Sequence, residues 1–128
     1  MPVYVANIEE ATLDNENFRK VLNTASHSQL VLMTLQPGED IGLEVHSDTD
    51  QFIRVEQGEG IALLDGVEYA IKDGSAVVIP AGVQHNITNT SLDKMKLYTI
   101  YSPPEHKDGV VHATKEDAQS DTSDHFEG

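Results

Sequence analysis

Short apolar runs separated by turn-forming residues are the feature that most constrains the fold of this 128-residue chain. Glycine, proline and Asp-Gly pairs recur at short intervals between Pro37 and Gly82, a pattern typical of short strands with turn signals roughly every 8–12 residues. The runs between them are short, and none carries a sustained helical period. This pattern predicts an all-β protein, either a barrel or a sandwich.

The individual runs agree with this prediction. Residues 29–35 form a dense apolar stretch that Pro37-Gly38 ends, which favours a buried strand over a helix. Asp65-Gly66 lies between two apolar runs and predicts a hairpin, because both residues tolerate positive φ angles. Further strands are expected at residues 52–55, 60–64, 67–71, 76–79 and 95–101.

The length of the chain fits one ordinary domain and not two. We expect residues 1–112 to form a single barrel domain with an irregular N-terminal lead-in. Residues 113–128 are rich in acidic and small polar side chains, which predicts a flexible C-terminal tail. The sequence of residues 115–118 allows a helical turn within that tail.

Composition excludes several classes of function. The chain has no cysteine, so disulfides and thiolate metal sites are excluded. Its 22 acidic residues against 8 basic ones give a formal net charge of −14, which repels nucleic acid and anionic lipid surfaces. Neither a membrane-length apolar run nor a signal-peptide pattern is present, so we expect a cytoplasmic protein.

Two histidine-bearing blocks carry the chemistry of the chain. On a strand, Glu44 and His46 point to the same face because they are two residues apart. Gln51 alternates with apolar residues and is therefore expected to face inward, and His85 follows a Pro-Ala-Gly turn. Two imidazoles, a carboxylate and an amide oxygen form a plausible ligand set for one divalent metal ion. Asp48 and Asp50 could supply the carboxylate instead, although a polar loop position favours solvation.

These blocks resemble the paired motifs of the cupin superfamily. The second family motif, G-x5-P-x-G-x2-H-x3-N, is complete here, with its fixed positions at Gly74, Pro80, Gly82, His85 and Asn89. In the first motif, G-x5-H-x-H-x(3,4)-E-x6-G, the residues Gly38, His46 and Gly58 match. Glu44 stands where the family has its first histidine, and Gln51 stands where it has its glutamate.

The resemblance implies a double-stranded β-helix, or jelly-roll, barrel similar to small cupins grouped with mannose-6-phosphate isomerase. It also implies that Glu44, His46, Gln51 and His85 bind one divalent metal ion. The two departures keep the ligand charge of the usual set, because the carboxylate has moved rather than disappeared. Replacing one imidazole nitrogen with oxygen favours manganese, iron or zinc over copper, and nickel is a further candidate.

Tyr101 and His106 are the candidate catalytic residues. If Lys96 faces solvent, strand alternation directs Leu97, Thr99 and Tyr101 inward, where a phenol at the barrel mouth could bind substrate or donate a proton. His106 follows the last strand and could act as an acid or base if its segment folds back over the barrel. The alternative interpretations are core filling for Tyr101 and a surface loop for His106.

Two functions remain open at this point. The first is an enzyme that uses its metal as a Lewis acid on a small oxygenated substrate, with isomerase, lyase or dioxygenase chemistry. The alternative is a non-catalytic small-ligand-binding or interaction barrel with a structural metal or none. No inward-facing lysine or arginine is evident, which disfavours a phosphosugar. The apolar face around Leu30 and Leu32 predicts a homodimer.

Overall fold

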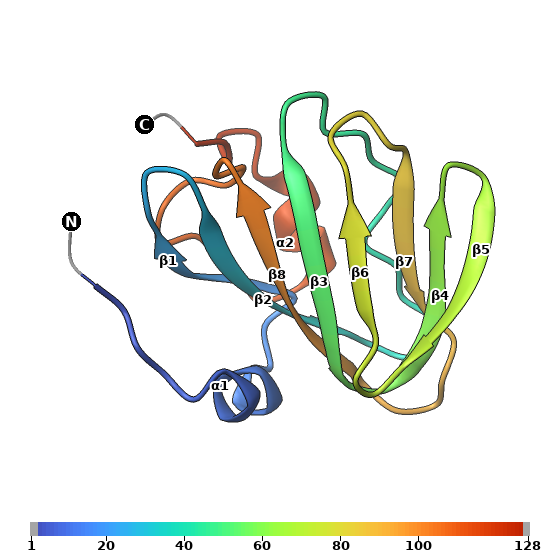
Figure 1. Cartoon of the computed structure of the whole chain (residues 1–128). Coiled ribbons are helices and arrows are strands. Elements are labelled where there is room, and N and C mark those ends of the chain that lie inside the picture. The colour runs from blue at the N-terminus through green and yellow to red at the C-terminus, as the bar shows by residue number, and fades with distance from the viewer. Residues whose placement is uncertain (1–2, 127–128) are drawn as a thin grey trace.

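The computed structural model describes residues 3–126 and shows two facing β-sheets with two short helices (Figure 1). In chain order the elements are α1 (Ile8–Asp14), β1 (Arg19–Thr24), β2 (Gln29–Leu35), β3 (Asp50–Gln57), β4 (Glu59–Leu64), β5 (Val67–Lys72), β6 (Ala76–Ile79), β7 (His85–Asn89), β8 (Met95–Ser102), β9 (Val111–His112) and α2 (Lys115–Ser120). The six-stranded sheet has the order β6-β3-β8-β2-β1-β9, and the three-stranded sheet has the order β5-β4-β7. The predicted all-β jelly-roll fold is confirmed. Neither helix in the described residues has the length and apolar character that a membrane span requires.

The turn chemistry of the sequence is largely realised. Asp65 and Gly66 connect β4 to β5 with φ angles of 49° and 81°, as the hairpin prediction requires. Gly60 lies within β4, in agreement with the strand expected at residues 60–64. A Cβ at this position would lie 2.1 Å from the carbonyl oxygen of Thr88 on the neighbouring strand. Glycine is therefore needed there for a close approach of two backbones.

Strand β8 lies in the centre of the larger sheet, between β2 and β3. Its inward-facing residues are buried as alternation predicts, and Leu97 and Thr99 are fully inaccessible. The condition that Lys96 faces solvent is not met, since this side chain is only 4% exposed. Its Nζ donates to the carbonyl oxygen of Asn15 at 2.5 Å and to Oε1 of Glu16 at 2.8 Å. The segment after α1 therefore covers the outer face of β8 at this point.

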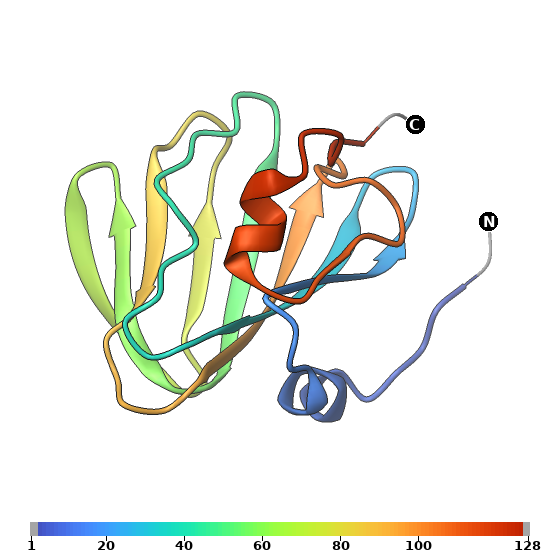
Figure 2. The ribbon, with the colours of Figure 1, turned by 180° about the vertical axis from the view of Figure 1, so that it is seen from behind.

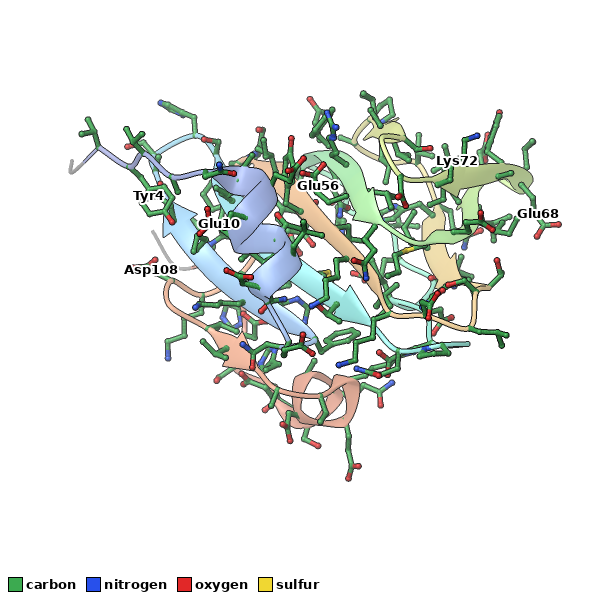
Figure 3. The ribbon with its side chains drawn as sticks, turned by 90° about the horizontal axis from the view of Figure 1, so that it is seen from below. Tyr4, Glu10, Glu56, Glu68, Lys72 and Asp108 are labelled. Carbon is green, nitrogen blue, oxygen red and sulfur yellow. The ribbon has the colours of Figure 1, made fainter. Side chains whose placement is uncertain are left out.

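Helix α1 covers part of the outer face of the six-stranded sheet. Asn7 caps its first turn by accepting a hydrogen bond from the backbone N–H of Glu10. The helix contacts β2, β3 and β8, and the view from below shows it lying across the sheet (Figure 3). Leu32 is buried within the single chain, whereas Leu30 is only partly buried. Part of the face expected to bind a second copy is thus already covered, and the homodimer stays a prediction.

The chain folds back after β8, in the region where the sequence predicts a tail. Strand β9 pairs with β1, and α2 lies across the larger sheet beside the connection from β2 to β3 (Figure 2). Lys115 of α2 forms an ion pair with Asp40 of that connection. Asp121 and Asp124 contact histidines of the barrel. The predicted helical turn is present in α2, while the flexibility of the segment stays a prediction.

Gln29, at the start of β2, fastens the connection that follows β8. Its Nε2 donates to the carbonyl oxygen of His106 at 2.8 Å and to Oγ1 of Thr24 at 2.9 Å. Its Oε1 accepts from the backbone N–H groups of His106 at 2.9 Å and of Glu105 at 3.3 Å. Because Gln29 is 1% exposed, water does not provide substitutes for these bonds. Residues 105 and 106 are thereby held against the sheet.

Replacing Gln29 with leucine tests whether its hydrogen bonds hold residues 105 and 106 against the sheet. We expect Gln29→Leu to lower the free energy of unfolding by about 2 to 4 kcal/mol, because it leaves buried backbone groups of His106 without partners. Urea-induced unfolding measures the loss. The matched control is Gln119→Leu on the exposed side of α2, for which a change within about 0.5 kcal/mol is expected. An equal loss of unfolding free energy in the two variants would contradict this role of Gln29.

The ion pairs of Glu16 predict an acid-dependent stability. Hydrogen bonds from Lys94 and Lys96 lower the pKa of Glu16 from 4.5 to about 2. The folded-state pKa lies below the unfolded one, so the stabilisation is complete above pH 4.5 and is lost as the pH falls towards 2. We therefore expect the difference in unfolding free energy between the parent protein and Glu16→Gln to shrink across that interval in urea titrations. Glu68→Gln, at an exposed position on β5, should show no such trend.

Candidate metal centre

The two motif blocks meet through their backbones. The N–H of Glu44 donates to the carbonyl oxygen of His85 at 2.9 Å, and the N–H of His85 donates back to Glu44 at 2.9 Å. Residues directly paired in an antiparallel bridge project to the same face, and His46 shares that face with Glu44. The bridge therefore brings three of the four predicted ligands together at one end of the barrel. Leu43 and Val45 are exposed on the opposite face, as alternation predicts.

His46 lies between two carboxylates. Its Nε2 is 3.3 Å from Oε2 of Glu44, and its Nδ1 is 3.3 Å from Oε1 of Glu105. Hydrogen bonds to Glu105 and then to Glu44 raise the pKa of His46 to about 9, against the opposing effect of burial. The hydrogen bond from His46 in turn lowers the pKa of Glu105. Burial acts to raise the pKa of Glu44, but the contact with His46 and the nearby positive charges lower it overall.

His85 is oriented by a backbone carbonyl. It is 4% exposed, its ring centroid lies 5.2 Å from that of His46, and its Nδ1 is 2.9 Å from the carbonyl oxygen of Val83. A carbonyl oxygen only accepts hydrogen bonds, so Nδ1 carries the proton when the ring is neutral. The lone pair of Nε2 is then available for coordination, as in many histidine ligands of metals.

Gln51 has an anchored nitrogen and an unpaired oxygen. Its side chain is 3% exposed, and its Nε2 donates to Oγ1 of Thr99 at 3.0 Å. Its Oε1 is buried and accepts no hydrogen bond. A buried acceptor without a partner costs about 1 to 3 kcal/mol, so such atoms are uncommon in native proteins. An oxygen in this state has the character of a ligand for a cation.

The donor set can be tested against the geometry of a bound ion. Two donors that lie about 2.1 Å from one ion are about 3 Å apart, close to the 3.3 Å between His46 and Glu44. Within residues 3–126, no three histidine, aspartate or glutamate side chains already surround one point as a complete metal site. Asp48 and Asp50 are exposed, and Asp50 is engaged by the backbone N–H of Ala81. Glu44 is therefore the better placed carboxylate.

The two candidate catalytic residues lie next to this set. Tyr101 is 2% exposed, and its ring meets those of His46 and His106 edge-on, with centroid distances of 5.9 and 5.0 Å. Burial raises the pKa of Tyr101, so its phenol stays protonated and is suited to donating a hydrogen bond. His106 is 8% exposed, and its Nδ1 lies 2.8 Å from Oδ2 of Asp124. Their catalytic roles stay predictions.

Sequence reasoning missed three charged residues near the site. Glu105 contacts His46, Asp124 contacts His106, and Arg19 is a buried residue of β1. The expectation that no arginine faces inward is wrong, because the region before residue 29 was interpreted as an irregular lead-in with a turn of helix or a first strand, and no inward face was assigned to it. The alternation of Arg19 and Val21 with exposed Lys20 is the signal that could have revealed its orientation.

A surface groove lies at the other end of the barrel. Its lining combines turn residues with the ends of strands, namely Gln36, Pro37, Gln57, Gly58, Glu59, Asp73, Ser91, Leu92, Asp93 and Lys94. None of the predicted ligands is among these residues. The histidines lie at the start of β7 and before the start of β3, whereas this groove lies where those strands end. The groove is thus separate from the chemistry of the two motif blocks.

Comparison with known proteins gives relatives that cover most of the chain. The uncharacterized protein YrkC of Bacillus subtilis strain 168 is 49% identical over 121 residues, which cover 90% of this chain and 65% of the relative. The uncharacterized protein L612 of Acanthamoeba polyphaga mimivirus is 49% identical over 113 residues, with 85% and 71% covered. This chain thus spans slightly less than two thirds of the length of YrkC.

Solved structures extend the similarity to the fold. BH2720 from Bacillus halodurans is 44% identical, with a TM-score of 0.91 over 92% of this chain and 94% of that one. A predicted oxalate decarboxylase from Thermotoga maritima, tm1287, is 25% identical, with a TM-score of 0.57 over 59% and 65%. These similarities do not test membership of the mannose-6-phosphate isomerase-like group. Residues 31–101, more than half of the chain, match the cupin domain profile, and the chain therefore belongs to the cupin superfamily.

Proposed function

We propose that this cupin binds one divalent metal ion through Glu44, His46, Gln51 and His85 and uses it in catalysis on a small oxygenated substrate. The observation that carries the proposal is the buried Oε1 of Gln51, which accepts no hydrogen bond. Coordination would give this oxygen a partner. A merely orienting glutamine would be expected to use both ends of its amide.

In three of the proposed ligands, the side-chain atom that would not coordinate the metal already has a partner within the protein. Oε1 of Glu105 lies 3.3 Å from Nδ1 of His46, the carbonyl oxygen of Val83 accepts from Nδ1 of His85, and Thr99 accepts from Nε2 of Gln51. Such outer partners fix the tautomer and orientation of ligands in metal proteins. The anchoring supports Nε2 of each histidine as its coordinating atom. Small side-chain rotations would then complete the set around one point.

The donor set favours certain metals and reactions. Two nitrogens and two oxygens suit manganese, iron, zinc or nickel. When bound, a divalent ion of this kind polarises a carbonyl, hydroxyl or carboxylate oxygen. Isomerase and lyase reactions use such polarisation, and the proposal extends to dioxygenase chemistry if the bound ion is iron. Cytoplasmic location and assembly as a homodimer stay predictions from composition and from the apolar outer face.

In this proposal, two residues beside the set transfer protons. Tyr101 keeps its phenolic proton, so it can donate a hydrogen bond or a proton to a substrate oxygen. Asp124 accepts from Nδ1 of His106 and leaves Nε2 of that ring free to accept a proton. The second candidate function is a non-catalytic ligand-binding barrel. The contact between Tyr101 and His106 would then serve packing alone.

Metal titration of Gln51→Leu tests the proposal. Calorimetric titration of the metal-free parent with Mn²⁺ and Zn²⁺ should give one site per chain, and the variant should bind at least about tenfold more weakly. In the absence of metal, the variant should be as stable as the parent or more stable, because its unpaired oxygen is gone. Weaker metal binding together with unchanged or higher stability would distinguish a metal ligand from a residue with a structural role.

Two further variants accompany Gln51→Leu, one at the other end of the barrel and one at His85. Gln57→Leu alters a glutamine at the far end of β3 and should bind metal like the parent. His85→Ala should abolish stoichiometric binding. A parent protein that binds less than one equivalent, with no difference from Gln51→Leu and His85→Ala, would exclude the metal site and favour the ligand-binding barrel.

A further inference from the structure

Arg19 lies on the inner face of the larger sheet. It pairs with Met33 of β2, which is fully buried in the hydrophobic core, and it is itself only 7% exposed. Alternate residues of β1 share a face, and Val21 accordingly belongs to the core as well. The only other arginine of the chain, Arg54, is exposed and pairs with Glu56.

The guanidinium of Arg19 is oriented by neutral groups. Its Nη1 lies 3.4 Å from Nδ1 of His112, and its Cζ lies 5.2 Å from the ring centroid of Phe18. Nε2 of His112 lies 3.0 Å from Oδ2 of Asp121, which places the ring proton on Nε2 and leaves Nδ1 as an acceptor. His112 can therefore hold the guanidinium in place but cannot neutralise it.

Arg19 forms no ion pair with a carboxylate of the described residues. The ion pairs of Lys and Arg there involve Arg54, Lys94, Lys96 and Lys115. Nε of Arg19 is buried and has no hydrogen-bond partner. A buried charge is costly unless it is paired and hydrogen-bonded. An anion that enters the barrel would provide both.

The position of Arg19 connects it to the proposed metal centre. Burial raises the pKa of Tyr101, and the positive charge of Arg19 acts against that increase. The same charge also stabilises the carboxylates of Glu44 and Asp124. Arg19 is thus electrostatically close to a predicted ligand, to the phenol and to the partner of His106. The C-terminal segment also links the two places, because Asp121 contacts His112, the partner of Arg19, and Asp124 contacts His106 beside Tyr101.

We propose that Arg19 binds the carboxylate of a small substrate that offers a second oxygen, such as a hydroxyl or keto group, to the metal centre. This inference rests on the proposed function and specifies its substrate class. The contact with His112 occupies Nη1 and leaves the edge formed by Nε and Nη2, which matches the two oxygens of a carboxylate.

The surrounding charges favour a carboxylate over a phosphate. A single guanidinium balances one negative charge, whereas a phosphate monoester carries nearly two at neutral pH. Glu44, Glu105 and Asp124 are negative groups near the same interior, and each further charge on a ligand would be repelled by them. A phosphosugar therefore stays disfavoured even though an inward-facing arginine exists.

The direct test observes the Nε–H group of Arg19 by ¹⁵N NMR. With two arginines in the chain, two Nε–H signals are expected, and Arg54→Met identifies which belongs to Arg19. Glycolate serves as the probe because it carries one carboxylate and one hydroxyl. It is titrated into the metal-free protein at constant ionic strength, with glycolamide as a neutral control and inorganic phosphate as a second anion. We expect glycolate to shift the Arg19 signal saturably and to leave the Arg54 signal in place.

Three variants supply a second readout through calorimetric titration with glycolate. Arg19→Met should weaken binding by at least about tenfold, Arg19→Lys should weaken it less, and Arg54→Met should leave it unchanged. Arg19→Met should unfold at the same urea concentration as the parent or a higher one, because it removes an unpaired buried charge. If this variant does not fold, the Arg19→Lys titration and the parent spectra still decide the outcome.

Several results would overturn the assignment. They are an unmoved Arg19 signal, equal glycolate affinity in Arg19→Met, or glycolamide or phosphate binding at Arg19 as tightly as glycolate. Using metal-free protein keeps the two proposals separate. Arg19-dependent binding of glycolate in a protein that fails to bind Mn²⁺ would refute the metal centre alone, while metal binding without an Arg19 response would refute only the substrate class.

Discussion

The pairing of β8 with two strands at once is the constraint on which the rest of the barrel depends. This strand holds β2 on one side and β3 on the other, so it joins the beginning of the chain to its middle. Thr99 on its inner face anchors Gln51, and Tyr101 packs against His46. The strand then leads to residues 105 and 106, which Gln29 fastens to the start of β2. The candidate site is therefore built on the centre of the sheet.

Two positively charged groups, His46 and Arg19, determine the electrostatics of the site. His46 is held between Glu44 and Glu105, and in the metal-free state a proton on its ring is stabilised by both carboxylates. A divalent cation would compete with that proton for the same negative groups. Arg19 is the remaining positive charge of the interior, and its neutral partner His112 leaves it available to an anion. Under the two proposals, an acidic surface surrounds an interior that binds both a cation and an anion.

Strand alternation predicted those features of the site that depend on neighbouring residues. It placed Glu44 with His46, put Leu43 and Val45 on the opposite face, and directed Leu97, Thr99 and Tyr101 inward. Lys96, on the outer face of β8, does not reach solvent because the segment after α1 covers that face, although it lies about eighty positions away in the chain. Neither burial nor an ion pair across such a separation leaves a periodic signal in the sequence.

By itself the sequence determined the all-β class, the hairpin at Asp65-Gly66 and the motif spacing that marks a cupin. These depend on side-chain periodicity and on turn chemistry, both of which act over a few residues. Only the tertiary structure decided that Glu105 contacts His46, that Asp124 contacts His106 and that Arg19 lies unpaired in the interior. Each of these contacts depends on where the chain returns after β8. That return is stabilised by long-range packing and hydrogen bonds, which local spacing does not encode.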